Sequence, residues 1–163
     1  MKTLQILLKT NSTYGPFIAR LALGFVMLPH GAQKVLGWFG GHGFTGTMQF
    51  FTGTMHIPML FALLAITAEF AGALGLIVGL LSRVAAFGIA TVMAVAITMH
   101  AANGFFMNWA GSQKGEGIEY HILAIGLALV VMIQGAGKAS LDGLIAAKCD
   151  QGSAPKNPQH ASI

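Results

Sequence analysis

The sequence predicts an all-α membrane protein, a four-transmembrane-helix bundle with a short interfacial helix between helices 1 and 2. Three observations support this prediction. The 163 residues are 55% hydrophobic and 9% charged, whereas about a quarter of the residues of a soluble protein are charged. Residues 57–81 form an apolar run long enough to span a bilayer, and Glu69 is the only charged residue in it. The 22 glycines suit helix contacts in lipid, where small residues let two backbones approach.

The first spanning helix is expected over residues 15–37, after a segment, residues 1–13, that should lie at the membrane surface. Pro16 falls in the first turn, where its missing N–H is harmless. Pro29 lies inside the helix and should kink it. At about 100° per residue, the polar and small residues of this helix share one broad stripe. That stripe should face the bundle interior and consists of Arg20, Gly24, His30, Gly31 and Lys34.

Residues 38–57 connect the first two spanning helices. Phe44, Met48, Phe51 and Met55 recur at spacings of four, three and four residues, which is typical of the apolar stripe of a short helix in the membrane interface. A partly ordered loop is the alternative.

The second spanning helix begins near Pro58, and the third and fourth are expected over residues 84–103 and 118–135. A ladder of small residues in the second helix should let a neighbouring backbone come close: Ala68, Gly72, Gly75 and Gly79. Helices two and three meet in a tight hairpin. The membrane domain covers residues 14–147, with 138–147 along the membrane surface, and residues 148–163 read as a disordered tail.

Four spans place both termini on one side of the membrane. The positive-inside rule makes that side cytoplasmic, because six basic residues fall on it: Lys2, Lys9, Arg83, Lys138, Lys148 and Lys156. The chain should therefore be a multi-pass protein in contact with the lipid bilayer. No basic block with interleaved aromatic residues is present, so a nucleic acid is not an expected partner.

Glu69 lies roughly at mid-depth and has to be explained. A carboxylate facing lipid costs a few kcal/mol, so it should face the interior and either find a partner or stay protonated. Lys34 and His30 are the candidate partners. Together with other polar residues in the outer half of the bundle they define a candidate site: Glu69, His100 and Lys34 as catalytic residues, and His30, Asn103 and Glu119 as cofactor-binding residues.

Each of these groups also has a structural interpretation. A buried pair of Glu69 with Lys34 or His30 could simply fix how the helices pack. His100 and Asn103 could bind a carbonyl-bearing ligand such as a quinone, or cap helix ends. Glu119 and His121 project in different directions, so at most one of them belongs to the site. Arg20 reads as a snorkelling or helix-pairing residue.

A metal site is not expected. The four residues His30, Glu69, His100 and Glu119 could in principle ligate a metal ion. However, no HxxxH or ExxH pair places two ligands on one face of a helix.

Several motifs resemble the DoxX family over residues 14–143: HGAQKVLGWFGG, AEFAGALGLIVGLLSRVAA and GIEYHILAIGLALVVMIQGAGKASLD. The resemblance implies a four-helix protein of the bacterial inner (plasma) membrane, similar to the membrane subunit of thiosulfate:quinone oxidoreductase. Fold-level analogy constrains architecture more than chemistry.

Two functions follow as hypotheses. The first is a quinone-interacting subunit of a redox system, with quinone as its redox ligand, no tightly bound cofactor and electrons supplied by a partner. The second is a non-enzymatic scaffold or assembly subunit that recruits a soluble redox enzyme. Whether the chain is itself an enzyme stays open. A small transporter is less favoured, because the sequence shows no inverted repeat. The small-residue face of the second helix suits a homodimer, but it could equally pack within the bundle.

Overall fold

The computed structural model describes residues 6–152, and this part of the chain is helical and contains no strand. Its elements are, in order, α2 (Tyr14–Leu36), η1 (Trp38–Gly40), α3 (Gly43–Gln49), η2 (Phe50–Thr54), α4 (Met59–Val78), α5 (Ser82–His100), η3 (Ala101–Asn103), α6 (Glu119–Gln134) and α7 (Leu141–Gly152). The prediction of an all-α fold is confirmed.

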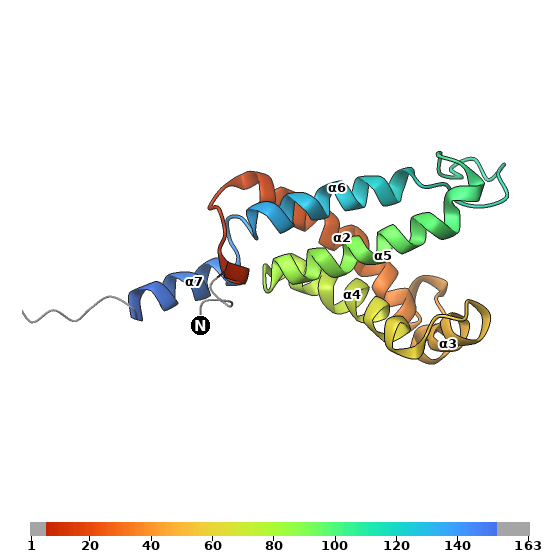
Figure 1. The fold of residues 1–163 in the computed structure, drawn as a ribbon, viewed down its shortest axis with the longest axis horizontal. Coiled ribbons are helices and arrows are strands. Elements are labelled where there is room, and N and C mark those ends of the chain that lie inside the picture. The colour runs from red at the N-terminus through yellow and green to blue at the C-terminus, as the bar shows by residue number, and fades with distance from the viewer. Residues whose placement is uncertain (1–5, 153–163) are drawn as a thin grey trace, which may run out of the picture.

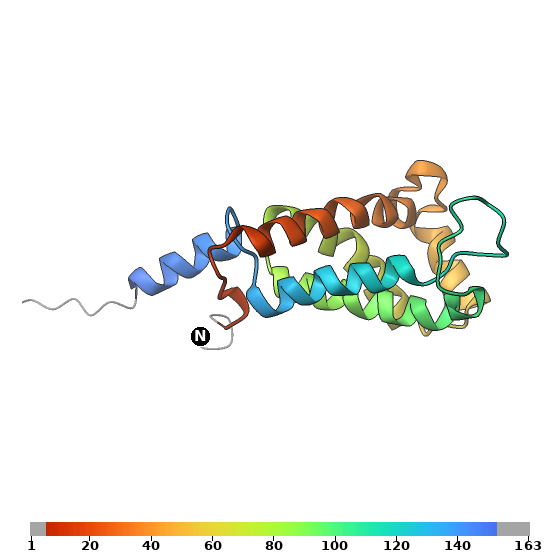
Figure 2. The same cartoon turned by 90° about the horizontal axis from the view of Figure 1, so that it is seen from above.

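The four long helices α2, α4, α5 and α6 lie side by side along the long axis of the molecule (Figures 1 and 2). Helix α2 contacts α4 and α6, and α5 contacts α4 and α6, so the four helices close a ring around one core. Larger side chains such as Leu23, Met27 and Ile89 fill this core together with several alanines. The alanines let the helices approach closely.

Two helices in the described part of the chain are long and apolar enough to cross a membrane. They are Met59–Val78, with a mean hydropathy of 2.1, and Ser82–Asn103, with a mean hydropathy of 1.9. Helix α6 is apolar but has 16 residues. Helix α2 has 23 residues but carries Arg20, His30 and Lys34.

The bounds of α2 agree with the predicted first helix to within one residue at each end. The helix ends at Gly37, which adopts a left-handed backbone conformation with φ of 73° that suits glycine. The chain stays helical through Pro29, so the proline does not interrupt α2.

The small-residue ladder of α4 packs against α5 within the chain. A Cβ atom added to Gly88 of α5 would lie 3.0 Å from the Cβ of Ala68, and one added to Gly72 would lie 3.7 Å from the Cβ of Ala85. The two helices join through a tight turn in which Gly79 and Leu81 have φ values of 71° and 49°. Of the two interpretations of this face, the structure therefore shows packing within the bundle.

The connection between α2 and α4 is helical, as predicted, since α3 runs directly into η2. Met48, Phe51 and Met55 of the predicted apolar stripe are half-buried, whereas Phe44 is exposed. The location of this segment in the membrane interface stays a prediction.

Both ends of the described chain lie at the same end of the bundle as the α4–α5 turn (Figure 1). Leu8 is buried, and the amide of Asn11 donates a hydrogen bond to the carbonyl of Gln134. Residues 8–11 of the predicted surface segment therefore pack on the end of α6.

Helix α7 projects away from the bundle (Figures 1 and 2). It runs to Gly152, so residues 148–152 are helical where the sequence analysis expected a disordered tail. Residues 1–5 of the surface segment and 153–163 of the tail lie outside the described residues.

Candidate functional site

Arg20 and Asp142 hold together the helix ends on the side of the bundle where α7 lies. The Arg20 side chain is 1% exposed and donates to five carbonyl oxygens: Leu76 at 2.7 Å, Ile77 at 2.7 Å, Ala136 at 2.8 Å, Lys138 at 3.1 Å and Ala139 at 2.6 Å. Two of these residues are in the last turn of α4 and the others follow α6. A positive charge is favourable there, because the last carbonyls of a helix have no partner within it and carry partial negative charge.

Asp142 completes this arrangement by capping α5. Its carboxylate accepts hydrogen bonds from the amides of Leu81 at 2.7 Å and Ser82 at 2.9 Å. Its own amide donates to the carbonyl of Gly79 at 2.8 Å. We call Arg20 and Asp142 the helix-end clamp. The helix-pairing interpretation of Arg20 agrees with these contacts, whereas the capping role of Asp142 was not foreseen.

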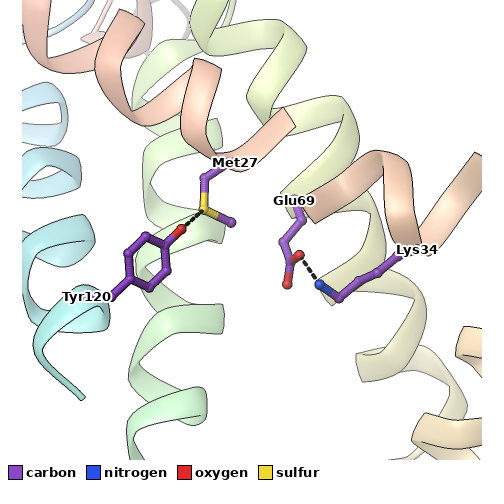
Figure 3. A network of polar contacts seen from close by, with 4 residues as sticks. All are labelled: Met27, Lys34, Glu69 and Tyr120. Atoms are coloured by element: carbon purple, nitrogen blue, oxygen red, sulfur yellow. Dashed lines mark hydrogen bonds and ion pairs between the residues drawn. The ribbon is translucent and has the colours of Figure 1, made fainter. Parts of the chain in front are cut away.

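Lys34 and Glu69 form an ion pair between α2 and α4 (Figure 3). Glu69 is 3% exposed, and the Lys34 ammonium donates to its Oε2 atom. The pairing depends on Gly31, since a Cβ atom added there would lie 2.6 Å from the Cα of Phe70. The two backbones cross closely at that point. Lys34, one turn beyond Gly31, is therefore brought opposite Glu69, and of the two candidate partners, Lys34 and His30, it is Lys34 that pairs with the carboxylate.

A row of four aromatic rings lies between α2, α5 and α6. The ring centroids of His30 and Tyr120 are 5.9 Å apart, those of Tyr120 and His121 are 5.5 Å apart, and those of His121 and His100 are 5.1 Å apart. We call these residues the ring row. The sequence analysis assigned His30 and His100 to the site, left His121 as an alternative to Glu119 and missed Tyr120. The neighbouring letters EYH at the start of α6 were the available signal.

The ring row meets the ion pair at Met27. The hydroxyl of Tyr120 donates a hydrogen bond to Met27 Sδ at 3.3 Å, and Met27 lies between Tyr120 and Glu69 (Figure 3). Glu69 is near enough to His30 and Tyr120 to interact with both electrostatically. The ion pair and the ring row therefore form one polar region inside an otherwise apolar bundle.

The imidazoles of His100 and His121 differ in their hydrogen bonding. His100 Nδ1 lies 2.8 Å from the carbonyl oxygen of Ala96. A carbonyl can only accept, so Nδ1 carries the proton and Nε2 of the neutral ring is an acceptor. His121 is 7% exposed, and its buried Nδ1 makes no hydrogen bond of acceptable geometry. The carbonyls of Gly117 and Ile118, one turn earlier, are the nearby polar groups.

The side chains of Asn103 and Glu119 form hydrogen bonds with the loop of residues 104–117. The Asn103 amide donates to the carbonyl of Glu116 at 3.0 Å. The carboxylate of Glu119 accepts from the amide of Met107 at 2.9 Å and from the indole of Trp109 at 3.1 Å. The structure thus brings Lys34, Glu69, His30 and His100 into one region and gives Asn103 and Glu119 partners in the loop.

The site offers hydrogen bonds, stacking surfaces and a carboxylate. Within residues 6–152, no group of three or more His, Cys, Asp or Glu side chains is arranged to hold a metal ion. The ring row can stack on a planar ligand and hydrogen-bond its oxygen atoms. The ion pair adds a carboxylate and an ammonium group.

A separate groove of about 300 Å³ lies on another face of α2 and has only apolar residues in its lining. Leu28, Ala32 and Leu36 of α2 contribute to it. His30 and Lys34 occupy the opposite side of this helix, because a two-residue offset corresponds to about 200°. The groove is therefore distinct from the ring row.

One comparison with known proteins gives a match: the family model described as DoxX covers residues 15–102. This range includes Arg20, Lys34, Glu69 and His100 and ends before the fourth long helix. No curated protein and no solved structure gives a significant match.

Proposed function

The chain belongs to the DoxX family, and we propose that this membrane protein is a quinone-interacting subunit of a redox system. One observation carries the proposal: the ring row and the Lys34–Glu69 pair form a single polar region inside an apolar bundle. Ionisable residues inside a membrane bundle are rare and usually functional.

We also propose that α2, α4, α5 and α6 all cross the membrane. Their outward faces support this, since each carries large exposed apolar side chains, among them Phe25, Leu64, Phe87 and Leu123. Such a surface would cause association in water but suits contact with acyl chains. Helix α6 is about 24 Å long at 1.5 Å per residue, so its polar first turn would lie near the membrane interface. In this arrangement α3 and η2 lie at the outer interface.

The basic residues suggest which side is cytoplasmic. Lys9, Arg83 and Lys138 lie at the end of the bundle where α7 begins, because the Arg83 side chain bonds the carbonyl of Lys9 and the Lys138 amide bonds that of Thr13. By the positive-inside rule this end, with both termini, is cytoplasmic in the bacterial inner membrane.

Reporter fusions test this orientation. Green fluorescent protein fused to the C-terminus should fluoresce, and alkaline phosphatase fused at the same position should be inactive. Phosphatase fused within residues 104–117 should be active. The opposite pattern at either position would refute the proposed topology.

In the proposed mechanism, the quinone head stacks beside the ring row, and imidazoles of the row offer hydrogen bonds to its oxygen atoms. Reduction of a quinone to a quinol takes up two electrons and two protons. Glu69 serves as the proton-handling group, and Lys34 orients its carboxylate. Electrons come from a partner protein that carries a redox group, since the sequence contains no motif for a tightly bound flavin, haem or iron–sulfur centre.

Mass spectrometry of the protein purified from native membranes in mild detergent tests the proposal. Isoprenoid quinone and a stoichiometric redox partner should copurify with it. Glu69→Gln should abolish quinone turnover in the purified complex without unfolding the protein, because an amide keeps the shape of the carboxyl group but cannot carry its proton. His42→Gln, on an exposed residue, is the matched control. Normal turnover in Glu69→Gln would remove the proton role.

A scaffold that recruits a soluble redox enzyme is the second candidate. The 104–117 loop favours it, because Glu116 and Glu119 hold the loop in shape while Phe106 and Trp109 are 66% and 85% exposed. Exposed aromatic residues on an ordered loop are suited to a protein partner. A partner that copurifies without quinone would support the scaffold and refute the quinone proposal.

A further inference from the structure

We propose that His121 is the residue that hydrogen-bonds a carbonyl oxygen of the quinone head, with His100 as its positioning residue. This inference rests on the proposed quinone function and names the contact at that site. It assigns the contact to a residue beyond the matched range 15–102.

A buried polar atom of the polar region that lacks a hydrogen-bond partner is His121 Nδ1. The carboxylate of Glu69 is paired with Lys34, and the hydroxyl of Tyr120 is bonded to a methionine sulfur. Among buried side-chain nitrogen and oxygen atoms of residues 6–152, only His121 Nδ1 and Ser82 Oγ lack a hydrogen-bond partner. Ser82 is at the clamp end of the bundle, so His121 Nδ1 is the buried atom of this kind in the polar region. A buried polar atom without a partner is rare in a native protein and calls for an explanation.

The chemistry of imidazole fits both forms of a quinone. A ring nitrogen donates when it is protonated and accepts when it is not. The same atom can therefore donate to a quinone carbonyl and accept from a quinol hydroxyl. His121 also lies in the first turn of α6, where the positive end of the helix dipole favours negative charge on the ligand oxygen.

The ring row connects an exposed ring to this buried nitrogen. His30 is exposed, Tyr120 is half-buried and His121 is 7% exposed. Exposure thus decreases along the row from its outer end to His121. A planar head that enters beside His30 can stay in contact with aromatic faces as it moves inward, and offset stacking stabilises such contacts.

His100 acts through His121 and does not need to contact the ligand. Its ring centroid is 5.1 Å from that of His121, with an angle of 30° between the two planes. The hydrogen bond to Ala96 fixes both the orientation and the tautomer of His100. A fixed neighbour of this kind restricts rotation of the His121 ring.

Quinone binding to the purified full chain in detergent tests the inference. A quinone with a short alkyl tail is titrated, and quenching of tryptophan fluorescence is followed. His121→Phe keeps the ring packing and removes both nitrogens, and it should weaken binding about tenfold, the loss expected for one hydrogen bond from a buried group. His42→Gln should bind as the wild type does. Thermal unfolding of each variant shows whether the fold is retained.

Histidine-selective ¹⁵N NMR of the wild-type protein adds a measurement that does not depend on a variant folding. Quinone should shift the Nδ1 resonance of His121 and leave that of His42 unchanged. Unchanged binding in a folded His121→Phe protein, or an unshifted His121 resonance at saturating quinone, would overturn the inference while the proposed function stands. No saturable binding by the wild type would overturn both.

Discussion

Arg20→Ala is expected to destabilise this protein far more than a substitution of a surface residue would. The variant leaves five carbonyl oxygens, in the last turn of α4 and in the segment that follows α6, without the donors they have now. It also removes the positive charge of Arg20, which interacts with the buried carboxylate of Asp142. Removing one member of a buried charge arrangement costs about 3–5 kcal/mol. We expect the protein to unfold at a much lower temperature and to accumulate poorly in the membrane.

Thermal unfolding in detergent, followed by size-exclusion chromatography, measures this effect. Arg20→Lys should recover only part of the stability, because an ammonium has three donors where the guanidinium has five in a planar fork. Lys114→Ala, on an exposed loop residue, is the control and should unfold as the wild type does. A wild-type unfolding temperature for Arg20→Ala would show that the helix-end clamp does not stabilise the bundle.

The Lys34–Glu69 pair should show a strong coupling in a double-mutant cycle. Glu69→Leu leaves the Lys34 ammonium without its partner among mainly apolar residues and should destabilise the protein by about 2–3 kcal/mol. Lys34→Met in the same chain should restore most of this loss, because a pair of apolar side chains leaves no unpaired charge. Unfolding in mixed micelles of increasing denaturing detergent measures all four proteins.

The same four proteins distinguish a structural pair from a working site. If Glu69 handles protons, the stable double variant should still lack quinone turnover. Turnover restored together with stability would mean that the pair only fixes the packing of α2 on α4. Additive destabilisation by the two single substitutions would contradict the coupling itself. Lys114→Met is the matched control for the change from lysine to methionine.

The helices were predictable because their signals are local. Glycine after α2, proline before α4 and the apolar runs between them mark helix ends within a few residues of where the structure has them. The Lys34–Glu69 pair was also accessible, since a carboxylate in an apolar run needs a partner. The helical continuation over residues 148–152 could not be predicted from the sequence, because that stretch is polar and its apolar residues show no helical periodicity.

The ring row and the loop contacts of Asn103 and Glu119 could not be read from local signals. His30, His100 and His121 meet only because α2, α5 and α6 are rotated about their axes so that these rings face one another. Tyr120 precedes His121 by one residue and would ordinarily point about 100° away. Its ring nevertheless joins the row because it spans the gap between α2 and α6.

The sequence by itself determined that this protein is helical, that it has helices suited to a membrane and that it belongs to the DoxX family. A helix satisfies its own backbone hydrogen bonds, so composition and periodicity are enough to place it. Only the tertiary structure decided that Arg20 binds carbonyls 56 to 119 positions away, that Asp142 caps α5 and that His121 Nδ1 is buried without a hydrogen-bond partner. These contacts depend on how helices distant in the chain cross and rotate against one another, and local sequence does not encode that geometry.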